Sequence, residues 1–181
     1  MLYKGMSKRE IEEDIKSVGD YVQIDRLNNF LNTGPPMDIK KFIYLKLSEI
    51  YENKSMFNDA ANCFNNAALI TITYVEKIKY YTKEAEMYIK GGHFEKVESS
   101  MRKAMNNANT IQKPQIEEDI RNMYKTLAED YATGDKRSHA VKIYEKLLTM
   151  KISDEEKAEI KEKLKALYTS LGRYQDAGFL G

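Results

Sequence analysis

The residues best suited to chemistry in this chain are one cysteine and two histidines. Cys63 carries a potential nucleophile, but it directly precedes Phe64 in a predicted helix, next to core positions. A buried and unreactive thiol is the expected state there. His93 and His139 come just after two predicted turns and lack the spacing to carboxylates and other histidines that is typical of a zinc site. The sequence therefore predicts no catalytic residue, no cofactor and no metal ligand.

The pair Gly91-Gly92 raises the question of a phosphate-binding loop, because glycine lets the backbone approach a phosphate closely. Such loops follow a strand, and a Lys-Ser or Lys-Thr pair comes after the glycines. Neither feature accompanies Gly91-Gly92. We expect these glycines at the C-terminal end of a helix instead, where glycine takes a positive φ without steric cost.

Four tyrosines in nearly the same sequence context indicate how the chain is organised. Tyr51, Tyr88, Tyr131 and Tyr168 follow one another at spacings of 37, 43 and 37 residues. Around each of them apolar residues recur at steps of three and four, which is typical of one face of a helix. We expect these residues of the pattern to be buried by packing: Ala60, Phe64, Tyr88, Ala104 and Tyr131. Turn-forming residues then separate this helix from a second one. Repeats of this length indicate an array of helix pairs, and such arrays usually bind other molecules rather than transform them.

The first full unit carries a resemblance to a known family. Seven residues stand at offsets that read aromatic, Leu-Gly, Tyr, Ala, Phe and Ala: Tyr44, Leu47, Ser48, Tyr51, Ala60, Phe64 and Ala67. This pattern resembles the tetratricopeptide repeat, with Ser48 in place of glycine and Ile72 in place of the closing proline. The longer period is similar to that of the soluble NSF attachment proteins. The resemblance implies an all-α fold, a right-handed α-solenoid of about five antiparallel helix pairs with the last pair truncated.

We expect one domain that covers residues 1–181 and contains five units. The predicted units are 5–36, 37–73, 74–114, 115–152 and 153–181. Two capping boxes mark predicted helix starts, Ser7 with Glu10 and Ser153 with Glu156. In each box the two side chains satisfy free backbone N–H groups at the beginning of the helix.

Breaks in the helical pattern separate the units. Pro35-Pro36 closes the first pair because proline cannot continue a helix. The stretch from Asn109 to Pro114 is expected to do the same before the unit that begins at 115. The last helix would start near Tyr174 and run for about two turns. Phe179 and Leu180 do not provide the polar outer face that the end of an array needs. We expect them to fold back onto the last pair or to join a second copy in a homo-oligomer.

Composition excludes several classes of function. Charged residues make up 31% of the chain, yet the formal net charge is only +1. This balance argues against long-range attraction to nucleic acid or to an anionic membrane. No apolar run approaches the roughly eighteen residues of a membrane span. A single cysteine forms no internal disulfide and favours a reducing compartment, so the cytoplasm is the expected location.

The family resemblance also points to a candidate binding surface. It implies that the first helix of each pair lines a concave groove, and that the position two residues before the tyrosine faces this groove. Glutamates occupy that position in four units, and Ala166 ends the series. With one neighbour added, the candidate partner-binding residues are Glu13, Glu49, Glu52, Glu86 and Glu129. Such an acidic ladder suits a basic peptide or helix. The alternative is ordinary surface ion pairs, because a Lys or Arg stands three or four residues from each glutamate of the series.

Three hypotheses about function follow. The first is a non-catalytic interaction module or scaffold that holds a peptide or helix of a partner protein in its groove. The second is a homo-oligomeric structural or adaptor subunit that assembles through Tyr174, Phe179 and Leu180. The third is a helical-repeat RNA-binding protein, which the near-neutral charge disfavours. Capture of C-terminal carboxylates, known from some proteins with this repeat, is not expected in the first full unit, because Leu45 and Glu49 stand where those proteins have Lys and Asn.

Overall fold

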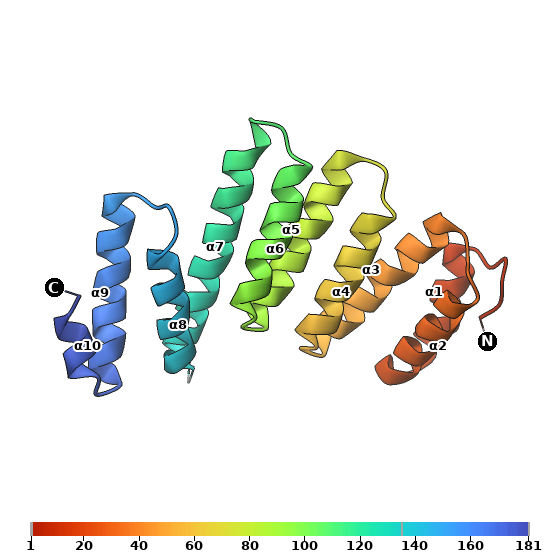
Figure 1. Cartoon of the computed structure of the whole chain (residues 1–181). Helices are drawn as coiled ribbons and strands as arrows, with labels where there is room; N and C mark the ends of the chain where they lie inside the picture. Colours follow the sequence, from red (N-terminus) through yellow and green to blue (C-terminus); the bar gives the residue numbers. More distant parts are fainter. Residues whose placement is uncertain (1, 135, 181) are drawn as a thin grey trace. The chain divides into compact units, whose positions relative to one another are not determined.

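The computed structural model describes residues 2–134 and 136–180, and all regular secondary structure in these ranges is helical (Figure 1). The helices are α1 (Lys8–Lys16), α2 (Asp20–Asn32), α3 (Met37–Asn53), α4 (Phe57–Leu69), α5 (Tyr74–Lys90), α6 (Phe94–Asn106), α7 (Gln112–Thr133), α8 (Arg137–Leu148), α9 (Asp154–Ser170) and α10 (Tyr174–Gly178). The prediction of an all-α fold is confirmed for the described residues.

The chain forms two compact units, Met1–Ile116 and Glu117–Gly181, each of which contains more than one of the predicted repeats. The first and second unit are these two parts of the chain. In the first unit, α2 packs against α3, α3 against α4, α4 against α5, and α5 against α6. In the second unit, α9 packs against both α8 and α10. Neighbouring helices such as α3 and α4, or α5 and α6, run in opposite directions (Figure 1). Packing of this kind, in which helices contact their neighbours in sequence, is typical of helical repeats.

Both predicted capping boxes are present. At the start of α1 the Ser7 N–H donates to Glu10 Oε2 at 2.7 Å, and the Glu10 N–H donates to Ser7 Oγ at 3.3 Å. Ser153 and Glu156 make the same two bonds at the start of α9. These helix starts are determined by local sequence, because each box uses only residues within one turn.

One predicted boundary was wrong. The prolines Pro35-Pro36 do separate α2 from α3, but the break before α7 lies at residues 107–111, and Pro114 belongs to the first turn of α7. A proline fits there because the first N–H groups of a helix have no partner within the helix. Pro114 therefore lies at the start of a helix, whereas the sequence pattern predicted that it ends the break before one.

The turns after three of the repeated tyrosines share one hydrogen bond. Each tyrosine carbonyl accepts from the N–H five residues later: Met56 to Tyr51 at 2.8 Å, His93 to Tyr88 at 2.9 Å and Arg173 to Tyr168 at 2.8 Å. The residue before each donor has a positive φ: Ser55 at 57°, Gly92 at 73° and Gly172 at 74°. This geometry closes the helix end. It confirms that Gly91-Gly92 ends a helix.

The core of the first unit combines small and large side chains. Ala60, Phe64, Tyr88 and Ala104 are buried, as predicted, and the two alanines have 0% exposure. Small side chains at such positions let helices approach closely, while the larger ones fill the space between pairs. In the second unit, Tyr131 is only half-buried, contrary to the prediction. Its ring faces the turn after α7, with the His139 ring 5.9 Å away and Lys136 Nζ 5.2 Å from its centre.

A buried carboxylate interrupts the apolar core. Glu84 of α5 is 2% exposed. It stands four residues before the repeated tyrosine, at the position that leucine takes in other repeats: Leu47, Leu127 and Leu164. Burial raises the pKa of Glu84, and the bond from Lys103 opposes that rise. Sequence analysis did not assign a role to this residue.

Lys103 of α6 compensates the buried charge. Its Nζ donates to the two Glu84 oxygens at 2.9 and 3.2 Å and to Asn65 Oδ1 of α4 at 2.8 Å. The same ammonium lies 5.5 Å from the centre of the Tyr81 ring. One lysine therefore connects α4, α5 and α6, and its charge is what makes a carboxylate tolerable at this position.

The close packing around Ala60 makes this site a test of the helix register. Ala60→Arg places a long cation where no space or partner exists, so we expect the free energy of unfolding to fall by at least about 3 kcal/mol. Thermal unfolding followed by circular dichroism measures this loss. Asn62→Arg, at an exposed position of the same helix, is the control and should unfold close to the wild type. An unchanged melting temperature for Ala60→Arg would show that the assigned register is wrong.

Removal of Lys103 should expose the cost of the buried Glu84. Lys103→Met leaves the carboxylate without its cation, and we expect a loss of roughly 3 kcal/mol at neutral pH. Because the pKa of Glu84 in the folded state lies above its usual value, the protonated form favours folding. The variant should therefore regain stability as the pH falls, and lose it as the pH rises through the folded-state pKa.

The matched control is the double variant Glu84→Leu with Lys103→Met, which restores the leucine found in the other units. Urea unfolding of both variants between pH 5 and pH 8 provides the comparison. The double variant should be more stable than Lys103→Met and insensitive to pH at this site. Equal stability of the two variants at neutral pH would contradict the role assigned to the pair.

Candidate functional site

The structure places the predicted glutamates on first helices of the pairs, and each one forms an ion pair. The partners are Arg9 for Glu13 at 2.9 Å, Lys46 for Glu49 at 3.3 Å, Lys90 for Glu52 at 2.6 Å, Lys83 for Glu86 at 2.7 Å and Lys163 for Glu129 at 2.8 Å. Each carboxylate therefore has a cation at contact distance. This pairing favours the interpretation as surface ion pairs over that of an acidic ladder.

Some of these pairs connect neighbouring helices. Lys90 of α5 contacts both Glu52 of α3 and, at 2.9 Å, Glu86 of its own helix. Burial by itself lowers the pKa of Lys90, but the bonds to the two glutamates outweigh burial and raise it. Partial burial likewise raises the pKa of Glu86 on its own, and Lys83 and Lys90 together bring it below the usual value. Glu52 and Glu86 thus belong to one charge network within the first unit.

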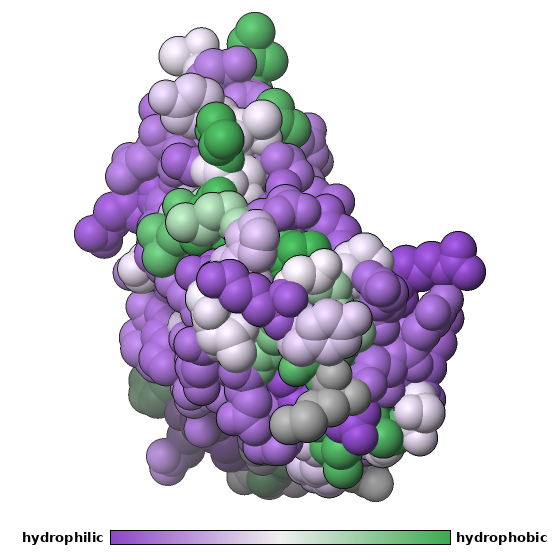
Figure 2. Space-filling model, turned by 90° about the vertical axis from the view of Figure 1, so that its right-hand side faces the viewer, coloured by the Kyte–Doolittle hydropathy of each residue, from purple (hydrophilic) through white to green (hydrophobic). Residues whose placement is uncertain are grey.

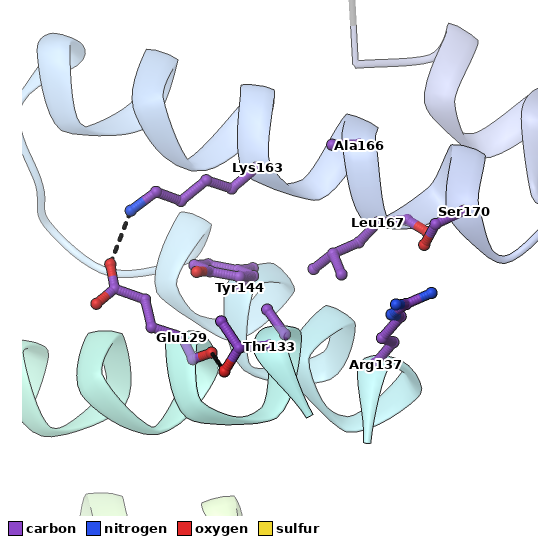
Figure 3. Close-up of a pocket in the computed structure, with 9 residues that line it drawn as sticks. Glu129, Thr133, Arg137, Tyr144, Lys163, Ala166, Leu167 and Ser170 are labelled. Carbon is purple, nitrogen blue, oxygen red and sulfur yellow. Dashed lines mark hydrogen bonds and ion pairs between the residues drawn. The ribbon is translucent and has the colours of Figure 1, made fainter. Parts of the chain in front are cut away.

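An open groove lies in the second compact unit (Figure 3). It has a volume of about 620 Å³ and is lined by side chains of α7, α8 and α9. Small and apolar residues contribute much of its surface: Ala132, Tyr144, Ala166 and Leu167. Because the groove is open to solvent and has an apolar floor, it can take an apolar side chain of a partner.

The two ends of the groove differ in charge: one holds an ion-paired lysine, and the other holds an arginine. At one end, Lys163 of α9 contacts Glu129 of α7 at 2.8 Å and Glu159 of its own helix at 2.7 Å. These bonds raise the pKa of Lys163, so it stays charged. At the other end, Arg137 extends from the start of α8 toward Leu167 and Ser170 (Figure 3). Arg137 makes no ion pair with any residue in 2–134 or 136–180.

Tyr144 lies between these two ends. Its side chain reaches the groove between α7 and α9 (Figure 3), although the residue is only 2% exposed. Burial raises the pKa of Tyr144, so the hydroxyl keeps its proton. The hydroxyl has no hydrogen-bond partner among the residues that the structure describes. Because Tyr144 lines the groove, its hydroxyl is able to donate to an acceptor from outside the chain.

The cysteine and the two histidines pack against other side chains of the fold. Cys63 is buried, and burial raises the pKa of its thiol to about 12, so the reactive thiolate is not formed near neutral pH. The rings of His93 and His139 pack edge-on against Tyr88 and Tyr131. Within the described part of the chain, no three His, Cys, Asp or Glu side chains come together as ligands for a metal ion.

Exposed apolar residues also occur outside the groove. Figure 2 shows small groups of hydrophobic residues on a mainly hydrophilic face. In the first unit, Ile72 is 91% exposed in the turn between α4 and α5, where Leu69, Tyr74 and Val75 are also exposed. In the second unit, Tyr174 is exposed and Phe179 is 87% exposed, whereas Leu180 is half-buried. Of the helices that the structure describes, none has both the length and the apolar character needed to cross a membrane.

Sequence analysis missed the groove residues Arg137, Tyr144 and Leu167. Tyr144 matches the position of Phe64 in the repeat, and the repeat pattern predicts core packing at this position. One signal was present, because Ala166 interrupts the series of glutamates at the place where the groove lies. Its meaning depends on which side chains of α7 and α8 face α9, and the repeat pattern does not provide that information.

The glutamates differ in burial, which predicts different effects of neutralisation. Glu49→Gln removes an exposed pair and should change the free energy of unfolding by less than about 0.5 kcal/mol. Glu86→Gln removes a carboxylate held by two lysines and should cost about 1 kcal/mol. Since the folded-state pKa of Glu86 is lowered, its contribution is present above the usual pKa and is lost as the pH falls through the folded value. Urea unfolding at pH 7 and pH 3 measures both effects, and equal losses for the two variants at pH 7 would contradict the assignment.

Comparison with known proteins leaves the resemblance to the tetratricopeptide repeat untested. No protein-family model matches the chain, and no curated protein matches it in sequence. The arguments about function therefore rest on the residues and the geometry described above.

Proposed function

We propose that this protein is a non-catalytic interaction module that holds a peptide or helix of a partner protein. The proposal includes the finer architecture, a right-handed α-solenoid of the tetratricopeptide kind. The observation that carries it is the groove of about 620 Å³ between α7, α8 and α9, with its apolar floor and with Arg137, which makes no ion pair with a described residue. An open groove of this shape accommodates a chain segment that enters at one end and leaves at the other.

The nature of the partner follows from charge and composition. A formal net charge of +1 gives no general attraction to a polyanion, which favours protein over nucleic acid as the partner. The single cysteine favours a reducing compartment, and we propose the cytoplasm. The glutamates remain candidate contacts for basic residues, but their lysine and arginine partners would have to be displaced first.

Blocking the groove tests the proposal. Ala166→Glu puts a carboxylate into the groove at an exposed position of α9 and should leave the fold intact. Ala158→Glu makes the same change at an exposed position of α9 that does not line the groove. Immobilised wild type, Ala166→Glu and Ala158→Glu are each exposed to native cell extract, and the retained proteins are quantified by mass spectrometry. We expect a set of proteins retained by the wild type and Ala158→Glu and reduced at least about tenfold by Ala166→Glu, equivalent to about 1.4 kcal/mol.

Equal retention by all three proteins would contradict docking in this groove. The exposed Phe179 and Tyr174 favour a second candidate, a homo-oligomer formed through the C-terminal segment. Analytical ultracentrifugation of the same samples separates the two. A mass that rises with concentration in all three proteins, together with equal retention, would favour the oligomeric subunit.

A further inference from the structure

Two grooves of this chain occupy equivalent places in the repeat. One lies in the first unit between α1, α2 and α3, and the other is the groove of α7, α8 and α9. In both, the lysine five residues before the repeated tyrosine contacts a glutamate of the preceding first helix. Lys46 contacts Glu12 at 3.1 Å, and Lys163 contacts Glu129 at 2.8 Å. The two grooves can therefore be compared position by position.

Several lining residues differ between the two grooves, among them the residue two positions before the tyrosine. Two residues before the tyrosine stands Glu49 in the first groove and Ala166 in the second. Glu49 lines a groove of about 270 Å³ that also contains Glu12 and Asp20. Ala166 lines a groove of about 620 Å³. At this position a partner carboxylate would meet Glu49 in the first groove, which also contains Lys16 and Lys46, whereas in the second groove it would meet the methyl group of Ala166.

The second groove also contains hydrogen-bond donors that have no acceptor among the described residues. The Arg137 guanidinium forms no ion pair within the described ranges, and it lies beside Ser170 at one end of the groove (Figure 3). The Tyr144 hydroxyl, in a residue that is 2% exposed, likewise bonds to no described residue. Lys163 is already engaged by Glu129 and Glu159 at the far end. A ligand there meets a neutral pair, while a ligand near Arg137 meets an unpaired cation.

We propose that the groove of α7, α8 and α9 recognises a protein segment in which an acidic side chain stands beside an apolar one. The acidic group pairs with Arg137, because a guanidinium binds a carboxylate through two parallel hydrogen bonds. The apolar side chain lies over Leu167 and Tyr144, and the Tyr144 hydroxyl donates to a carbonyl of the segment. This inference rests on the proposed function and specifies its partner. It also differs from the basic partner that the glutamate series suggested.

A random library of peptides of about twelve residues, displayed on phage, provides the probe. The library is selected in parallel on the wild type and on Arg137→Gln, which keeps hydrogen-bond donors but removes the charge. Peptides selected by the wild type should carry Asp or Glu within two positions of a large apolar residue, and those selected by Arg137→Gln should lose this preference. Wild-type peptides without acidic residues, or the same peptides from both proteins, would overturn the inference.

Binding of the best selected peptide is then measured by fluorescence anisotropy. Replacing its acidic residue by the matching amide should weaken binding to the wild type by about tenfold, and by much less for Arg137→Gln, since the partner charge is gone. Tyr144→Phe, which removes only the hydroxyl, should weaken binding of the acidic and amide peptides by the same factor. Ala166→Glu should abolish binding, while Ala158→Glu should leave it unchanged. Thermal unfolding confirms that each variant is folded.

The outcomes separate this inference from the proposed function. If Ala166→Glu loses proteins from cell extract but Arg137→Gln keeps its peptides, the groove binds partners by other chemistry and only the acidic specificity fails. If Ala166→Glu changes neither result, docking in the groove fails as well. A small carboxylate such as benzoate that displaces the peptide at equal concentration would assign the site to a small molecule and would overturn the inference. Salt should weaken the peptide complex, because raising it from 0.1 to 1 M shortens the Debye length from about 10 to about 3 Å.

Discussion

The fold of the first unit depends on the close approach of helices at fully buried alanines. Ala60 and Ala67 of α4, Ala85 of α5 and Ala104 of α6 have no exposed surface. A short side chain at each point allows backbones to lie close enough for the larger neighbours, such as Phe64 and Tyr88, to fill the remaining space. Single helix pairs cannot bury an apolar face alone, so each pair gains its stability from the next one.

Close packing also brings charged side chains of successive helices within reach. In the first unit, Lys90 of α5 contacts Glu52 of α3, and Lys103 joins Glu84 of α5 to Asn65 of α4. In the second unit, Lys163 of α9 contacts Glu129 of α7. Exposed pairs of this kind add little stability. These pairs occupy the glutamates of the series, whereas Arg137 lines the groove of α7, α8 and α9 and makes no ion pair with a described residue.

The proposed binding surface follows from departures within the repeat rather than from the repeat itself. Where Glu49 stands in one groove, Ala166 stands in the other, and the loss of a side chain leaves room above Tyr144 and Leu167. Tyr144 is a core residue by burial and a groove residue by the position of its hydroxyl. The repeat supplies a constant framework, and under the proposed function specificity would arise from the few positions at which the repeats differ.

Local signals in the sequence predicted much of the fold. The sequence by itself determined the helical class, both capping boxes and the turn at Gly91-Gly92, because helix periodicity, capping and positive φ depend on residues within one or two turns of each other. It misplaced the start of α7, since proline both ends helices and begins them. Only the tertiary structure decided that Glu84 is buried against Lys103, that Glu52 and Glu129 pair with lysines of other helices, and that Tyr144 and Arg137 share a groove with Ala166. These features depend on contacts between side chains on different helices, nineteen to thirty-eight residues apart for the three ion pairs, and the period of a repeat does not specify them.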